Sequence, residues 1–100
     1  RVDLFQLGQL PFEEPDTATF PGLALAYRAA QAGGSMPTVY NAANEEAVEL
    51  FLREKLPYLG IAELIGEAME RHRVIEDPTV SQILETEQET REYAARWKRP

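Results

Sequence analysis

Cysteine is absent from this 100-residue sequence, and histidine occurs only once. The lack of cysteine excludes disulfides, thiolate zinc sites and cysteine nucleophiles, and a single histidine leaves few ways to build a metal site or a proton relay. No apolar run approaches the roughly 20 residues that a membrane-spanning helix requires. The first residues, Arg1 to Leu4, include an acid where a secretory signal would be apolar. We therefore expect a cytoplasmic protein.

Basic side chains are also scarce, because 10 Lys and Arg stand against 17 Asp and Glu, for a formal net charge of −7. Such a balance repels phosphate backbones, so we expect neither a nucleic acid nor a membrane as partner. The hydrophobic share of 44% is ordinary for a globular domain. One basic cluster stands where a last helix would end, a position that cations favour through the helix dipole; it comprises Arg91, Arg96, Lys98 and Arg99.

The pattern of the sequence divides the chain at about residue 20. Residues 1–19 contain short, nearly alternating apolar stretches, a break at Gly8 and a polar turn around Pro15. These features predict an extended linker with a possible β-strand. Residues 20–100 show helical periodicity and are predicted to form a separate helical domain.

The first predicted helix begins at Pro21 and is ended by Gly33 and Gly34, which tolerate left-handed backbone angles. Its expected buried stripe is Leu23, Ala26, Tyr27 and Ala30. The second helix should run from about Pro37 to Lys55, with Ser35 as its N-cap. It is expected to be the most enclosed helix, with a stripe of Val39 or Tyr40, Ala43, Ala47, Leu50 and Phe51, widened by Val48 and Leu52.

The third helix has the clearest pattern, with Ile61, Leu64, Ile65, Ala68, Met69 and His72 on one face. Asp77 is then predicted to cap a short apolar turn, and Thr86 a separate terminal helix whose stripe is Tyr93, Ala94 and Trp97. Favourable i, i+4 pairs are expected on the exposed faces: Glu49–Arg53, Glu67–Arg71, Glu87–Arg91 and Glu92–Arg96. The predicted fold is therefore all-α, with four to five helices in a compact bundle or short superhelical coil after the extended linker.

Few residues suggest chemistry of their own. Gly33 and Gly34 lack the strand and the third glycine of a dinucleotide-binding loop. His72 has no second histidine or placed carboxylate on its face, so we expect a partly buried ring that bonds a neighbour. Three acids near Pro15 could bind a hard cation, but capping or turn bonds suit them better; they are Glu13, Glu14 and Asp16.

Asn41, Asn44 and Glu45 form the segment that an ordinary helix explains least well. Asparagine is a poor helix former, and the three residues share one face at spacings of three and four. The face could be a polar ligand site, or it could be a polar seam that bonds a loop backbone such as residues 13–20. We favour the seam, because an irregular linker carries many backbone groups that need partners.

Taken in order, several motifs resemble one family, the C-terminal part of 1-deoxy-D-xylulose 5-phosphate reductoisomerase. The match covers nearly the whole chain, and its ordered combination is more specific than any single motif. The residues that define it as a structural motif are Phe12, Pro15, Asp16, Phe20, Pro21, Asn41, Asn44 and Glu45, and the similarity continues through Ala47-Val48, Phe51-Leu52 and Arg91. Two positions depart from the family: Gly22 stands where cysteine is common, and Glu87 where an aspartate usually opens the last helix.

The resemblance implies a parent enzyme that isomerises and reduces 1-deoxy-D-xylulose 5-phosphate to 2-C-methyl-D-erythritol 4-phosphate in non-mevalonate isoprenoid biosynthesis. It also implies NADPH, a divalent cation (Mg, Mn or Co) and a homodimeric parent. The family's nucleotide-binding, metal-binding and catalytic positions lie on other parts of the polypeptide. For this chain we therefore expect no catalytic, cofactor-binding or metal-binding residue, no binding of NADPH, and a structural role beside the remaining domains of the parent.

An alternative stays open on the sequence alone, namely a free-standing acidic helical module that binds a basic protein partner. The amino-terminal residues discriminate between the two, because a remnant of a larger enzyme should leave an apolar end without its pairing strand. An independent module should instead fold that end onto its own core. The apolar residues concerned are Leu4, Phe5, Leu7, Leu10 and Phe12.

Overall fold

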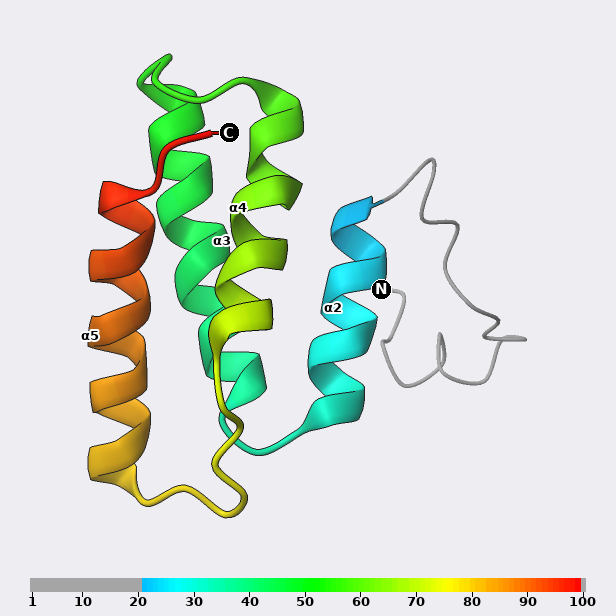
Figure 1. The fold of residues 1–100 in the computed structure, drawn as a ribbon, viewed down its shortest axis with the longest axis vertical. Helices are drawn as coiled ribbons and strands as arrows, with labels where there is room; N and C mark the ends of the chain where they lie inside the picture. The colour runs from blue at the N-terminus through cyan, green and yellow to red at the C-terminus, as the bar shows by residue number, and fades with distance from the viewer. Residues whose placement is uncertain (1–20, 100) are drawn as a thin grey trace, which may run out of the picture.

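The structure, a computed structural model, describes residues 21–99. Four α-helices make up this part of the chain, and no strand occurs in it. The helices, labelled as in Figure 1, are α2 (Pro21–Ala32), α3 (Met36–Leu52), α4 (Tyr58–Arg71) and α5 (Val80–Arg96). The predicted linker and strand of residues 1–19 lie outside the described residues, as do the motif residues Phe12, Pro15, Asp16 and Phe20.

Successive helices run in opposite directions, and α3 packs against each of the other three (Figure 1). Small side chains on α3 let its neighbours approach closely, since Ala43 and Ala47 are fully buried. The predicted all-α fold and the predicted central position of this helix are confirmed. Across the helices the core comprises Leu25, Ala29, Val39, Ala43, Ala47, Leu64, Ile65, Ala68, Met69 and Ala94.

The buried stripe of α4 agrees with its prediction, whereas that of α2 does not. Leu23 is 49% exposed, and the buried face of α2 is instead Ala24, Leu25 and Ala29. Leu25 lies over Gly66 of α4, where a Cβ added to the glycine would stand 3.8 Å from Leu25 Cδ2. Leu25, and not Leu23, is therefore the leucine of α2 that packs on α4.

The second helix ends earlier than predicted, at Leu52 rather than Lys55. Glu54 has a φ of 61°, which takes the chain out of the helix before Pro57. Val48 and Leu52 do not widen the buried face, because they are 37% and 69% exposed. The predicted Glu49–Arg53 pair is confirmed, with 2.9 Å between Arg53 Nε and Glu49 Oε2.

One continuous helix replaces the predicted apolar turn and separate terminal helix. Its N-cap is Thr79, not Asp77, which has a φ of 50°. Thr79 and Gln82 form a capping box, in which each side chain bonds the other residue's backbone N–H. Thr86 is buried inside α5 and accepts through its carbonyl from the Thr90 hydroxyl at 2.8 Å, so it caps nothing.

Candidate functional site

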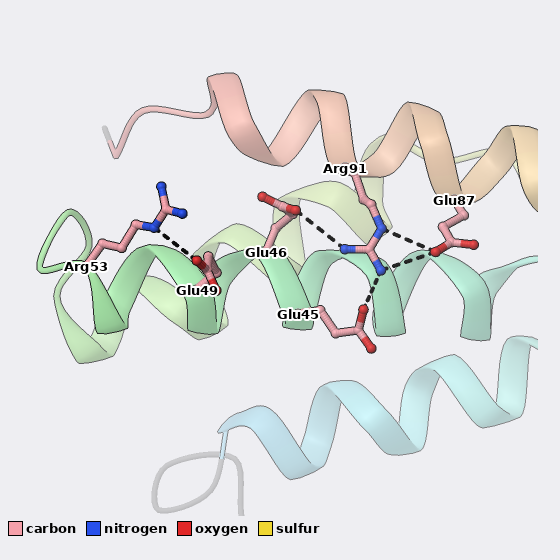
Figure 2. Close-up of polar contacts among 6 residues, drawn as sticks. All are labelled: Glu45, Glu46, Glu49, Arg53, Glu87 and Arg91. Carbon is pink, nitrogen blue, oxygen red and sulfur yellow. Dashed lines mark hydrogen bonds and ion pairs between the residues drawn. The ribbon is translucent and has the colours of Figure 1, made fainter.

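Arg91 of α5 reaches across to α3 and gathers three carboxylates (Figure 2). Its guanidinium donates to Glu45, to Glu46 at 3.4 Å and to Glu87 at 3.2 Å. The Glu87–Arg91 pair was predicted from its i, i+4 spacing and is confirmed. The contacts with Glu45 and Glu46 span 45 and more residues of sequence, so they depend on how α5 packs on α3.

Electrostatics at this cluster leave it net negative, since one guanidinium faces three carboxylates. Hydrogen bonding to Glu45, followed by that to Glu87, raises the pKa of Arg91, which stays charged at all ordinary pH. Beside the cluster lies a shallow cavity of about 230 Å³ between α3 and α5. Its lining is Thr38, Asn41, Ala42, Glu45, Ile83, Glu87 and Arg91.

The predicted polar face of α3 is thus brought partly against α5. Glu45 pairs with Arg91, and Asn41 lines the cavity with an exposed side chain. Asn44 is half-buried. The proposed partner of this face, residues 13–20, lies outside the described residues, so the seam stays a prediction. Glu87, interpreted from the sequence as part of a helix start, lies inside α5 instead and accepts hydrogen bonds from Arg91.

A second polar junction surrounds Ser35, where the α2–α3 turn meets the segment between α4 and α5. The fully buried Ser35 hydroxyl accepts from the Ile75 backbone N–H at 2.8 Å and lies 2.7 Å from His72 Nε2. The Ser35 N–H in turn donates to the Ile75 carbonyl at 3.0 Å. Ser35 does occupy the predicted N-cap position, but its side chain bonds this distant segment instead of the first turn of α3.

His72 behaves as the sequence predicts, as a half-buried ring bonded to a neighbour. The Ser35 hydroxyl accepts from the Ile75 N–H and keeps one proton and one further lone pair. It therefore donates to His72 Nε2 or accepts from it according to the tautomer of the ring. Burial lowers the pKa of His72, Glu89 acts in the opposite direction, and Arg71 adds to the lowering.

The end of the chain is fastened to α4 by a third set of contacts. Trp97 Nε1 donates to Glu67 at 2.9 Å, and Arg99 donates to both oxygens of Glu63 at 2.6 and 3.0 Å. The Arg99 hydrogen bonds lower the pKa of the Glu63 carboxyl. Arg71 lies 4.3 Å from the centre of the Tyr93 ring.

Two predicted surface pairs are therefore wrong within the described part of the chain. The Glu67–Arg71 pair does not form, because Glu67 accepts a hydrogen bond from Trp97 and Arg71 lies over the Tyr93 ring. The Glu92–Arg96 pair does not form either, and Glu92 accepts from Gln88 at 2.8 Å. In each case the glutamate accepts a hydrogen bond from a neutral side chain instead of pairing with the arginine.

The three junctions give this helical unit a geometry that can be compared with known proteins. The family model described as the DXP reductoisomerase C-terminal domain matches residues 1–93. The chain belongs to this family. The resemblance seen in the ordered motifs of the sequence is thereby confirmed.

Individual relatives agree with the family. The chain is 54% identical over 98 residues to 1-deoxy-D-xylulose 5-phosphate reductoisomerase of Agathobacter rectalis, covering 97% of this chain and 26% of that protein. It is 53% identical over 95 residues to the enzyme of the same name from Caldanaerobacter subterraneus subsp. tengcongensis, covering 95% and 25%. A solved structure of the Zymomonas mobilis reductoisomerase in complex with NADPH matches with a TM-score of 0.74 at 35% identity, over 94% of this chain and 25% of that one. The chain thus spans about a quarter of the length of its reductoisomerase relatives.

The residues of this C-terminal domain do not fit the groups that the family name implies. Among residues 21–99 no cluster of three or more His, Cys, Asp or Glu could hold a metal ion. The carboxylates of Glu45, Glu46 and Glu87 converge on the Arg91 guanidinium, which would repel a cation. Gly33 and Gly34 form the turn between α2 and α3, and the Ser35 N–H at the start of α3 already donates to the Ile75 carbonyl. No helix in this part of the chain is long and apolar enough to cross a membrane.

Proposed function

We propose that this chain is the C-terminal structural domain of an NADPH-dependent reductoisomerase. The whole enzyme would convert 1-deoxy-D-xylulose 5-phosphate to 2-C-methyl-D-erythritol 4-phosphate in isoprenoid biosynthesis, with a divalent cation held by other parts of the polypeptide. The observation that carries the proposal is the family match over residues 1–93 together with the quarter-length coverage of the relatives. The chain itself contributes no catalytic, cofactor-binding or metal-binding group.

The role we assign to the domain is to buttress the catalytic part. Residues 1–19 would form the connecting linker and residues 20–100 the helical unit. The polar side chains support this role, because the arginines with raised pKa values are paired with glutamates of the same domain. Arg91 is held by glutamates, and Arg99 and Glu63 by each other. A rigid support requires such internal satisfaction, whereas a catalytic acid or base requires a free lone pair or proton facing a substrate.

The test joins this chain to the preceding three quarters of the Agathobacter rectalis relative and compares the product with the same protein truncated after residue 20. We expect truncation to lower both the thermal midpoint and kcat/KM for the sugar phosphate. The Ser81→Ala variant, altered at an exposed position of α5, serves as the matched control. Unchanged turnover and midpoint after truncation would refute the buttress.

The absence of chemistry on the chain has its own test in the same full-length protein. Loss of a general acid or base costs about 10² to 10⁴-fold in rate. We expect His72→Gln to lower kcat by much less than 10²-fold, measured at a temperature where the protein is folded. A loss within that range, with the thermal midpoint unchanged, would place His72 in the chemistry.

The assembly and location of the parent complete the proposal. We infer a cytoplasmic homodimer, in keeping with the absence of cysteine and with the family resemblance. The dimer contacts would lie on the catalytic part. Sedimentation of the full-length protein and of its truncated form should then give the same dimeric state, and a monomeric truncated form would contradict this placement.

A further inference from the structure

Large apolar side chains are exposed mainly at one end of the helical bundle. Of the nine large hydrophobic residues exposed among residues 21–99, five lie where α3 ends and α4 begins, which we call the apolar end. It consists of Val48, Phe51, Leu52, Tyr58 and Leu59. The most exposed of these are Tyr58 at 71%, Leu52 at 69% and Leu59 at 64%. Such a concentration is typical of a contact surface, whereas scattered single residues need no explanation.

The antiparallel arrangement explains why these residues gather. Helix α3 ends and α4 begins at the same end of the molecule, where a short turn joins them, whereas α2 begins lower down, beside the middle of α4 (Figure 1). The Val48–Leu52 stretch lies in the last turns of α3, and Tyr58 and Leu59 lie at the start of α4. Two helix ends therefore contribute to one surface.

The apolar end is also rigidly built. The rings of Phe51 and Tyr58 meet edge to face with their centres 5.9 Å apart, across the turn that joins α3 to α4. Beneath that turn Leu56 is buried against Gly60, where an added Cβ would lie only 2.7 Å from Leu56 Cδ1. A preformed apolar surface loses little side-chain entropy when it is covered, and this favours docking.

What covers the surface is indicated by how much of each relative lies outside this chain. The relatives carry about three quarters of their length beyond the part that this chain matches. We propose that the apolar end docks against an apolar surface of the catalytic part that precedes it in the same polypeptide. This inference rests on the proposed function and specifies which face of the domain transmits the support.

Hydroxyl-radical footprinting of the full-length protein described above tests the docking directly. The chain offers matched leucines, because Leu52 and Leu59 are 69% and 64% exposed in the domain, and Leu84 on α5 is 60% exposed. Equal exposure of the same side chain should give equal oxidation. We expect several-fold slower oxidation of Leu52 and Leu59 than of Leu84 in the full-length protein, measured by peptide mass spectrometry. Equal rates would overturn the proposal.

Dilution separates the two possible occupants of this surface. Contact within one polypeptide does not depend on protein concentration, so the slower oxidation of Leu52 and Leu59 should persist on dilution to the point where the protein is monomeric. Protection that disappears on dilution would overturn the proposal, because the occupant would then be a second copy of the chain.

A pair of variants supplies an independent readout. The double variant Leu52→Ser, Leu59→Ser should split the thermal unfolding of the full-length protein into two transitions, while Leu84→Ser should leave one. A single transition in all three proteins would overturn the proposed face. If truncation after residue 20 nevertheless abolishes turnover, the proposed function stands and only the docking face is wrong.

Discussion

The substitution Ser35→Ala probes the junction that fastens the α4–α5 connection to the α2–α3 turn. The serine is fully buried, and its hydroxyl is bonded by the Ile75 N–H at 2.8 Å and lies 2.7 Å from His72 Nε2. Removing the hydroxyl leaves the amide without its acceptor, at a cost of about 1–3 kcal/mol for a buried donor. Water can partly replace the bond to the half-buried His72, which adds about 0.5–1 kcal/mol. The free energy of unfolding should therefore fall by about 1.5–4 kcal/mol.

The assay is urea denaturation of the 100-residue chain followed by circular dichroism at pH 7. Ser81→Ala is the control, since Ser81 is exposed on α5 and alanine there is neutral or slightly stabilising through helix propensity. A loss below about 0.5 kcal/mol for Ser35→Ala, no larger than an exposed change produces, would refute the reasoning.

The same junction fixes the sign of a pH dependence. Because burial lowers the pKa of His72, the unfolded chain binds more protons than the folded one below the ordinary histidine pKa of about 6.5. Stability should thus be fully present above that pH and fall below it, by at most about 1.4 kcal/mol per pH unit for one group. The fall in stability between pH 7 and pH 5 should be smaller in His72→Gln, measured by the same urea denaturation. An equal fall in that variant would assign the pH dependence to other groups.

Three further substitutions test the packing and charge arguments by the same denaturation assay. Gly34→Ala should destabilise the chain by more than about 2 kcal/mol, because its φ is +56° and the added Cβ would lie 2.4 Å from the Ile75 carbonyl oxygen. Gly33→Ala should cost only about 1 kcal/mol, because its φ is +68° but the added Cβ meets open space. Equal costs would exclude the clash. Leu64→Ala, at a fully buried position, should cost about 2–5 kcal/mol, and an unchanged midpoint would contradict the register of α4. Arg91→Met should cost about 1 kcal/mol and less at high salt, because its ion pairs are partly exposed; a salt-independent effect would point to packing instead.

The contrast between α4 and α2 shows how far apolar periodicity can predict burial. In α4, polar or small residues separate Leu64 and Ile65 from Ala68 and Met69, so only one face can be buried. In α2, four apolar residues follow one another from Leu23 to Ala26, and several registers satisfy the pattern equally. The choice between them depends on how α2 packs on α3 and α4, which no local pattern contains.

The polar contacts divide in the same way, into those between neighbours on one helix and those between segments far apart in the sequence. Glu87–Arg91 could be predicted because both partners lie on one helix, four residues apart. The contacts of Arg91 with Glu45 and of Ser35 with Ile75 join segments 40 or more residues apart, and they exist only once the helices are packed. The serine after the glycine pair is typical of a cap, but its hydroxyl accepts instead from the Ile75 N–H of a distant loop.

The kind of contact that holds each helix differs between α5 and α2. Helix α5 is held to α3 and α4 by charged and aromatic groups, through Arg91, Trp97 and Arg99. Helix α2, by contrast, packs through Leu25 and Ala29, and it leaves Leu23 on the surface at the end where the chain enters. Polar contacts fix one arrangement of α5 without further help, whereas apolar packing of a short helix gains stability from every additional surface that covers it. Helix α2 would therefore gain the most stability from a covering surface, and an apolar contact of this kind can support a neighbouring domain without any chemistry of its own.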